Sequence, residues 1–207
     1  MSDTEIQHAT ESDLLDVALL HCAVFSDHFL GKLSPQLISR FYASFLKDAM
    51  FIVARNGDDR LQGFLLGGPT ETLDLAREVF VRSERLKIAL EVLTSPSLWT
   101  ATLSRLKLRL SPKAQKPSEV STTPVRLLSI AVSPDSKGRG VAAQLTSVFE
   151  SLLKDGTIYG LSVEDKNARA VAFYEKMGMT LDGKWGSSVF FYKKVKHGAN
   201  SETDHDV

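Results

Sequence analysis

The hydrophobic positions in the first half of the chain follow helical and strand spacings in turn. Apolar residues three or four apart predict helices over about 10–25, 35–45 and 72–93, with a further helix after Pro96. Two apolar runs, 51–54 and 61–66, flank an Asn-Gly-Asp-Asp turn and predict a β-hairpin that Gly67-Gly68-Pro69 closes.

The second half alternates between strand and helix patterns. Strands are expected at 127–132, 158–163, 179–181 and 188–195, and helices at 141–152 and 167–177. A Gly183–Gly186 turn joins the last two strands. The strand–helix–strand crossover is parallel and the hairpins are antiparallel, so we expect an α/β fold with a mixed, mostly antiparallel central sheet flanked by helices. A single domain is expected over 1–196, with a helical insert at about 70–110, a connection to 124 and a disordered tail at 197–207.

Composition narrows the class of protein. The 207 residues have a formal net charge of zero and 43% hydrophobic content, as in an ordinary globular domain that recruits neither nucleic acid nor an acidic membrane. No apolar run approaches the roughly 18 residues of a membrane span, and the acidic N-terminus is unlike a signal peptide, so we expect a cytoplasmic protein. Cys22 is the single cysteine, which excludes an internal disulfide and a multi-cysteine metal site; no metal is expected.

One stretch predicts a phosphate site. The apolar strand 127–132 runs into a Ser-Pro break, and the loop Lys137-Gly138-Arg139-Gly140 then leads to Val141 and Ala142 at the start of an amphipathic helix. The first turn of a helix has free N–H donors and a partial positive charge, and glycines remove the Cβ atoms that would keep a ligand away. The pattern therefore favours a phosphorylated ligand.

Two motifs resemble those of the GCN5-related N-acetyltransferase (GNAT) superfamily. Lys137-Gly138-Arg139-Gly140-Val141-Ala142 resembles its Gln/Arg-x-x-Gly-x-Gly/Ala acetyl-CoA signature, with Lys at the Gln/Arg position. Asn167-Ala-Arg-Ala170-Val-Ala-Phe173-Tyr174-Glu-Lys-Met-Gly178-Met179 resembles the family's Asn-x-x-Ala-x-x-x-Tyr-x-x-x-Gly-Phe stretch, with Met179 in place of Phe. The resemblance implies that acetyl-CoA lies where the two parallel strands diverge.

The same resemblance implies roles for individual residues. Asn167 would help to bind the pantetheine arm, and Tyr174 would act as general acid toward the departing CoA thiolate. The backbone groups of Ile130 and Val132 would face the pantetheine and the acetyl carbonyl. The full set of expected acetyl-CoA contacts is Ile130, Ala131, Val132, Lys137, Gly138, Arg139, Gly140, Val141, Ala142, Asn167, Ala170, Phe173 and Tyr174.

The general base remains open at this stage. Many family members use a Glu on the fourth or fifth strand, but 127–132 contains no acid. Glu164 is one candidate, and Asp27 and His28 in the loop after the first helix are others. Asp27, His28 and Phe29 are also the expected acceptor contacts, although His28 could equally be an ordinary exposed loop histidine.

The central insert is basic: eight Lys or Arg stand against two Glu between residues 82 and 116. It could dock an acidic or phosphorylated acceptor or could be a solvated helix face, as charge runs usually are.

The expected function is N-acetyl transfer from acetyl-CoA to a small-molecule primary amine such as an amino sugar, amino acid or polyamine, with a homodimer possible. The alternatives are acetylation of a protein N-terminus or lysine, and a non-catalytic acyl-CoA-binding module.

Overall fold

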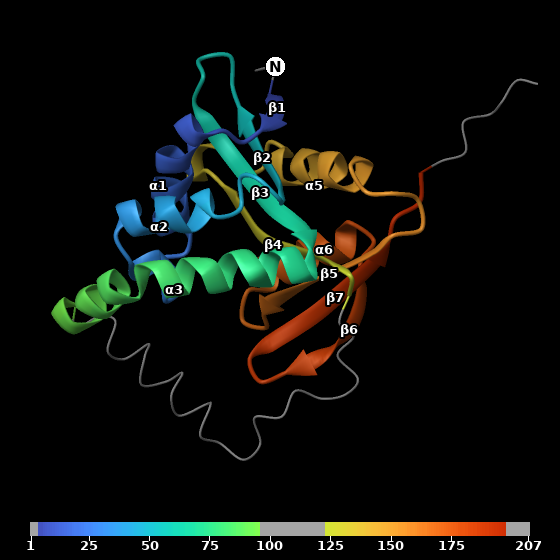
Figure 1. Ribbon diagram of the computed structural model, residues 1–207. Coiled ribbons are helices and arrows are strands. Elements are labelled where there is room, and N and C mark those ends of the chain that lie inside the picture. The colour runs from blue at the N-terminus through green and yellow to red at the C-terminus, as the bar shows by residue number, and fades with distance from the viewer. Residues whose placement is uncertain (1–3, 96–122, 198–207) are drawn as a thin grey trace, which may run out of the picture.

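The computed structural model describes residues 4–95 and 123–197, and a seven-stranded sheet forms its centre (Figure 1). The strands lie in the order β1-β2-β3-β4-β5-β7-β6, and every neighbouring pair is antiparallel except the parallel pair β4–β5. The strands are β1 (Glu5–His8), β2 (Met50–Arg55), β3 (Leu61–Pro69), β4 (Val125–Val132), β5 (Ile158–Glu164), β6 (Thr180–Trp185) and β7 (Ser188–Lys194).

Helices cover both faces of this sheet. Strand residues alternate between two cores: Phe51 and Val53 of β2 belong to one, and Ile52 and Ala54 to the other. Helices α1 (Leu14–Val24), α2 (Pro35–Ala43) and α3 (Thr70–Thr94) pack on the first face, and α5 (Val141–Ser151) and α6 (Ala168–Lys176) on the second. Short 3-10 turns are η1 (Glu11–Asp13), η2 (Leu30–Lys32) and η3 (Pro134–Ser136).

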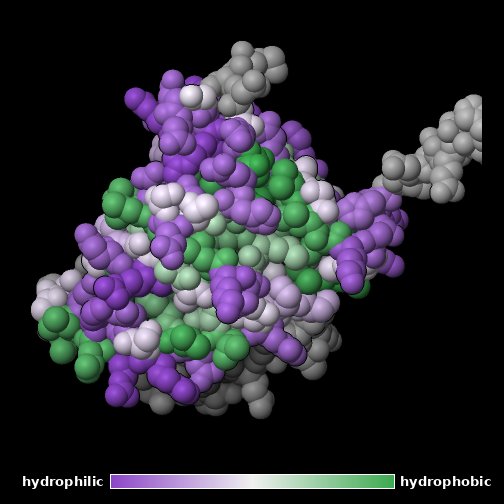
Figure 2. Space-filling view, turned by 45° about the horizontal axis from the view of Figure 1, so that its top comes forward, coloured by the Kyte–Doolittle hydropathy of each residue, from purple (hydrophilic) through white to green (hydrophobic). Residues whose placement is uncertain are grey.

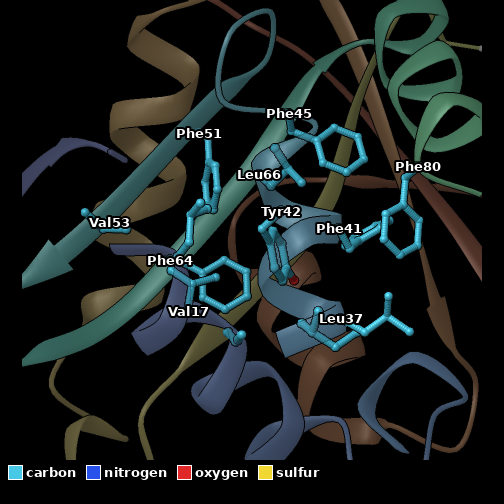
Figure 3. Packing of buried hydrophobic residues seen from close by; sticks show 14 of the residues in the cluster. Val17, Leu37, Phe41, Tyr42, Phe45, Phe51, Val53, Phe64, Leu66 and Phe80 are labelled. Atoms are coloured by element: carbon cyan, nitrogen blue, oxygen red, sulfur yellow. The ribbon is translucent and has the colours of Figure 1, made fainter. Parts of the chain in front are cut away.

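An aromatic cluster fills the first core (Figure 3). Tyr42 of α2 lies fully buried at its centre, with ring centroids 5.3 Å from Phe41, 5.5 Å from Phe51 and 5.2 Å from Phe64. The contact with Phe64 is edge-to-face, which suits the quadrupoles of the two rings. This packing holds the Tyr42 ring in one orientation.

The helix ends follow the signals in the sequence. Ser34 caps α2 by accepting a hydrogen bond from the Leu37 amide, and Pro35 takes the first helical position. At the end of α6, Gly178 has φ 74°; its amide bonds to the Glu175 carbonyl, and the Met179 amide bonds to the Tyr174 carbonyl. These two bonds form a Schellman motif, as the glycine after the predicted helix indicated.

The predicted fold class is confirmed, with differences at several elements. Strand β1 was not predicted, because four residues at a sheet edge leave a weak pattern. The Gly67-Gly68-Pro69 segment continues β3, where it pairs with β4, and does not end the hairpin. Strand β6 runs on to Trp185, so the turn is shorter than Gly183–Gly186. The helix predicted after Pro96 and most of the connection and tail lie outside the described residues.

Helix α3 buries less of its length than the spacing predicted. Leu73 and Phe80 are buried, but Leu86 and Leu90, expected on the same stripe, are 78% and 62% exposed. Ile88 and Val92 pack toward the core in their place. Near its C-terminal end, Glu91 accepts hydrogen bonds from the amide (2.8 Å) and the hydroxyl of Ser34. The far half of α3 is therefore attached to the start of α2.

A buried ion pair ties α1 to the sheet. Asp13 is 2% exposed, and one carboxylate oxygen accepts from Arg55 of β2 at 2.6 and 3.0 Å. Burial by itself would raise the pKa of the Asp13 carboxyl, but hydrogen bonds from Thr10 and Arg55 outweigh it and leave the pKa lowered. The carboxylate is therefore charged and paired at neutral pH.

The outer surface is mixed. On the face shown in Figure 2, hydrophobic residues are interrupted by hydrophilic ones. Within residues 4–95 and 123–197, no helix combines the length and the apolar character that crossing a membrane requires.

Candidate functional site

The site begins where β4 and β5 separate. The parallel register joins Val125 to Tyr159 and Arg126 to Gly160, and no further pair follows along these two strands. β4 is the fourth of seven strands, so its residues would ordinarily be covered on both edges. Leu128, Ser129 and Ile130 are nevertheless only partly buried. The β4 edge past Arg126 is therefore left without a neighbouring strand, and its N–H and C=O groups remain available for an extended ligand.

A β-bulge lies at the point of separation. Ser129 faces Leu66 of β3 and Leu127 faces Gly67, so the β3–β4 register passes over Leu128. An extra residue of this kind disrupts the ladder locally and turns neighbouring side chains. Leu128 packs toward the α1–α2 face, whereas Leu127 and Ile130 pack on the opposite face. The bulge was not predicted, because a one-residue insertion leaves no mark on the apolar pattern.

The glycine loop opens α5 as predicted. Gly138 and Gly140 have φ of 83° and 82°, and Gly140 is the N-cap residue of the helix. A Cβ added at either position would meet no protein atom within 4 Å. The positive φ angles explain the glycines, and the space in front of them is open for a ligand. The Val141 and Ala142 amides lie in the first turn of α5, which has no intrahelical acceptors for them.

The other residues around this loop and strand that were expected to contact acetyl-CoA lie close to the glycines or on β4. Lys137 and Arg139 are exposed next to the glycines. Ile130 and Val132 pack on the α5 face, whereas the Ala131 side chain is buried on the other face. Together these residues suit a phosphorylated ligand with an extended arm. The first turn of α5 and the two cations suit its phosphates, and the open edge of β4 suits its arm.

Helix α6 carries the second motif. The Asn167 side chain accepts from the Ala170 amide at 3.1 Å and so caps the helix, a structural role that the motif resemblance did not predict. Ala170 and Phe173 are partly buried against the second core. Tyr174 is 7% exposed and lies next to Phe173 and Phe191. Burial raises the pKa of the Tyr174 phenol to about 12, so it remains protonated at neutral pH.

The tertiary structure brings together three of the residues proposed for acceptor binding and proton transfer. His28, in the loop after α1, has its Nδ1 3.8 Å from Oε1 of Glu164, the last residue of β5. Lys166 Nζ lies 3.1 Å from the other Glu164 oxygen, and Asp27 contributes to raising the pKa of Lys166 after Glu164 itself. Glu164 and His28 are about one-third and one-half exposed. Phe29 packs against the first core behind them.

A second polar group, absent from the sequence prediction, lies under the same loop. His21 Nδ1 is 2.7 Å from the Tyr42 hydroxyl, which is 3.3 Å from the hydroxyl of Ser129 on β4. Burial, with a smaller contribution from His28, lowers the pKa of His21 to about 4, so its imidazole is neutral. With 6% exposure, His21 is a core histidine. The spacing of residues 21, 42 and 129 along the chain does not predict that their side chains contact one another.

Cys22 is not suited to carry an acyl group. Its thiol lies 3.7 Å from the Leu33 carbonyl oxygen, and burial raises the pKa of the thiol. A raised pKa lowers the fraction of the nucleophilic thiolate at neutral pH.

These features define an α/β domain in which a glycine loop opens α5 beside two separating parallel strands. The sequence profile of the acetyltransferase (GNAT) family matches residues 109–179, about a third of the chain. This match and the fold together confirm the predicted resemblance to the GNAT acetyltransferases. The family and fold support acetyl-CoA-dependent acetyl transfer in general.

Solved structures agree on the fold. A Corynebacterium glutamicum protein named histone acetyltransferase HPA2 and related acetyltransferase is 15% identical, with a TM-score of 0.60 over 97% of this chain and 100% of its own. An N-acetyltransferase from Staphylococcus aureus is 17% identical, with a TM-score of 0.58 over 91% and 98%. The PaiA N-acetyltransferase from Thermoplasma acidophilum, solved with coenzyme A, is 15% identical, with a TM-score of 0.52 over 93% and 99%. No curated protein matches the chain by sequence.

We expect acidification to destabilise the protein through His21. The unfolded imidazole titrates at 6.5 and the folded one near 4, so the unfolded state binds more protons as the pH falls between these values. The free energy of unfolding should therefore drop by ~2 kcal/mol from about pH 7.5 to about pH 5. Urea unfolding at several pH values measures this drop. His21→Asn should flatten it, and His8→Asn, at an exposed histidine, should leave it intact; equal slopes in all three proteins would contradict the assignment.

Proposed function

We propose that this protein is an acetyl-CoA-dependent N-acetyltransferase that acetylates a primary amine of a small molecule, of the amino sugar, amino acid or polyamine type, by direct transfer in a ternary complex. The observation that carries the proposal is the open edge of β4 beside the glycine loop. A strand edge left open in the middle of a sheet needs a ligand or solvent to satisfy its backbone groups. The family match supports acetyl-CoA as that ligand.

In this proposal the chain holds acetyl-CoA from two sides. The N–H groups at Gly138, Gly140, Val141 and Ala142 bind the pyrophosphate, with Lys137 and Arg139 adding positive charge. The backbone of Ile130 and Val132, with Leu128 at the bulge, lines the pantetheine. Bound acetyl-CoA supplies an acetyl thioester whose C–S bond breaks as the C–N bond of the new amide forms.

Glu164 is the proposed proton acceptor. A primary amine has a pKa near 10 and is protonated at neutral pH, so it must lose a proton before its lone pair can attack. The Glu164 carboxylate lies at the C-terminal end of β5, on the side where β4 has separated from it. His28, 3.8 Å away, and Asp27 in the same loop complete a group that can attract and orient an ammonium ion. Lys166 holds the opposite carboxylate oxygen in place.

Tyr174 is the proposed proton donor. Its phenol is protonated throughout the neutral range, since its ordinary pKa of 10 lies above that range and burial raises the pKa further, to about 12. It can therefore give a proton to the CoA sulfur as the thiolate leaves, whereas an exposed carboxyl group would already be ionised.

The support for a small acceptor is the compactness of this polar group. The side chains available to an amine gather at one point, where the loop after α1 meets the end of β5. In the described part of the insert, Arg82 pairs with Glu78 at 3.1 Å and Lys87 with Glu84 at 2.9 Å. For these two residues, the pairing favours the solvated-face interpretation over a docking surface for phosphorylated acceptors.

An acceptor screen tests the proposed substrate class. With acetyl-CoA present, we expect amino sugars, amino acids or polyamines to release free CoA thiol, measured with a thiol reagent. Turnover with peptides alone would show a protein acetyltransferase in place of the small-molecule enzyme. Binding of acetyl-CoA with no thiol release for any amine would favour the non-catalytic module.

Tyr174→Phe separates catalysis from binding. The variant keeps the ring that packs on Phe191 but loses the donor, so kcat should fall about 100-fold while CoA affinity changes less than about twofold. Calorimetry and the thiol assay measure the two quantities. Tyr192→Phe, at a partly exposed tyrosine of β7, is the matched control and should retain wild-type kcat. Full turnover in Tyr174→Phe would remove this residue from the proposed chemistry.

Glu164→Gln should alter the pH dependence of turnover. Without the carboxylate, the reaction depends on the fraction of the amine that is already neutral in solution. Below the amine pKa, this fraction increases about tenfold for each pH unit. We expect turnover about 100-fold lower at neutral pH, with partial recovery as the pH rises. Glu175→Gln, at an exposed residue of α6, should keep the wild-type profile. An unchanged profile in Glu164→Gln would exclude Glu164 as the base.

A further inference from the structure

Three polar side chains from different elements form a continuous line that ends on β4. His21 comes from α1, Tyr42 from α2 and Ser129 from β4, and their polar atoms are 2.7 and 3.3 Å apart. The first two are almost completely buried in an apolar cluster, whereas Ser129 is partly exposed. Burying hydrogen-bonding groups in such a core is costly unless they are satisfied. Apolar side chains would pack there without this cost, so we look for a role of these three residues beyond packing.

The direction of the hydrogen bonds follows from burial. His21 is neutral, so one ring nitrogen carries a proton and the other does not. Its Nε2 is buried and has no hydrogen-bond partner within the described parts of the chain. A proton there would be an orphaned buried donor, which is rarer than an under-satisfied acceptor. The proton is therefore placed on Nδ1, which donates to the Tyr42 oxygen, and the Tyr42 hydroxyl donates to the Ser129 oxygen.

This direction leaves the Ser129 hydrogen to donate elsewhere. The Ser129 oxygen already accepts from Tyr42, so the hydroxyl is held as a donor toward a third group. The rings of His21, Phe41, Phe51 and Phe64 surround the Tyr42 ring and fix it. Figure 3 shows the three phenylalanines around it. A donor held in this way loses little entropy when an acceptor arrives, which is the property of a preorganised site.

The bulge decides where Ser129 points. Regular alternation would put Ser129 on the face of Leu127, away from Tyr42. Because the register passes over Leu128, Ser129 instead shares the α1–α2 face, on the stretch of β4 that β5 no longer covers. That stretch is the one along which the proposed function places the pantetheine, whose end carries the acetyl thioester.

We infer that the Ser129 hydroxyl donates a hydrogen bond to the acetyl carbonyl oxygen of bound acetyl-CoA, with Tyr42 and His21 as positioning residues. The inference rests on the proposed function and adds a side-chain contact to it. The carbonyl oxygen is a hydrogen-bond acceptor and gains negative charge during acyl transfer. Free CoA lacks this oxygen, and its thiol is a weak acceptor. Ser129 therefore distinguishes acetyl-CoA from CoA.

The test compares the affinities of the two ligands in the full chain. For Ser129→Ala, calorimetry should show acetyl-CoA affinity about three- to ten-fold lower, the usual value of one hydrogen bond, with CoA affinity unchanged. The kcat should fall at least about tenfold, because the contact strengthens as charge develops. Ser147→Ala, at an exposed serine of α5, should change none of these values.

Tyr42→Phe tests the positioning role. It keeps the ring but removes the donor to Ser129. The affinity for acetyl-CoA should therefore also fall, but by less than in Ser129→Ala. In the double variant with Ser129→Ala, the loss should equal that of Ser129→Ala alone, because both act through one hydrogen bond. A purely structural role would lower the affinity of both ligands together.

The outcomes separate this inference from the proposed function. Equal losses for CoA and acetyl-CoA in Ser129→Ala, or no loss for either, would overturn the Ser129 contact while leaving the acetyltransferase proposal standing. A wild-type protein that binds neither ligand would overturn both.

Discussion

The separation of β4 from β5 is the constraint on which the rest of this structure depends. Two residue pairs join the strands at their start, and beyond Arg126 the central strand β4 has an open edge. A sheet interrupted in this way exposes backbone groups that ordinary strand pairing would satisfy. The glycine loop follows β4 after the short η3 turn, and Glu164 ends β5, so the proposed phosphate site and the proposed proton acceptor both lie at the open end.

The helices on the α1–α2 face hold the acceptor side of this opening in place. Tyr42 is fixed among aromatic rings, and Glu91 near the end of α3 binds the residue that caps α2. The loop carrying Asp27 and His28 lies between α1 and α2, so both of its ends are anchored in the same core. The described part of the helical insert, α3, thus supports this face through packing, and it forms ion pairs within itself and with Arg40 of α2.

Much of the fold could be predicted from the sequence, because the local signals were strong. Ser34-Pro35 marked the start of α2, Gly178 marked the end of α6, and the apolar spacing located α5 and β4. The exceptions have physical reasons. β1 is too short to show alternation, and Leu86 and Leu90 lie on a face of α3 that is turned away from the core, where Ile88 and Val92 pack in their place. Periodicity indicates that a face is apolar, but not that something covers it.

The sequence by itself determined the elements, the glycine loop and the motif on α6, because each depends on residues close together along the chain. Only the tertiary structure brought His28 to Glu164 and joined His21, Tyr42 and Ser129, since these contacts span from 21 to 136 residues and depend on how α1 and α2 pack across the sheet. The bulge at Leu128 adds a single residue to β4, and it determines which face of the sheet Ser129 lies on. One extra residue turns Ser129 toward the buried tyrosine, and no pattern of apolar and polar letters records that turn.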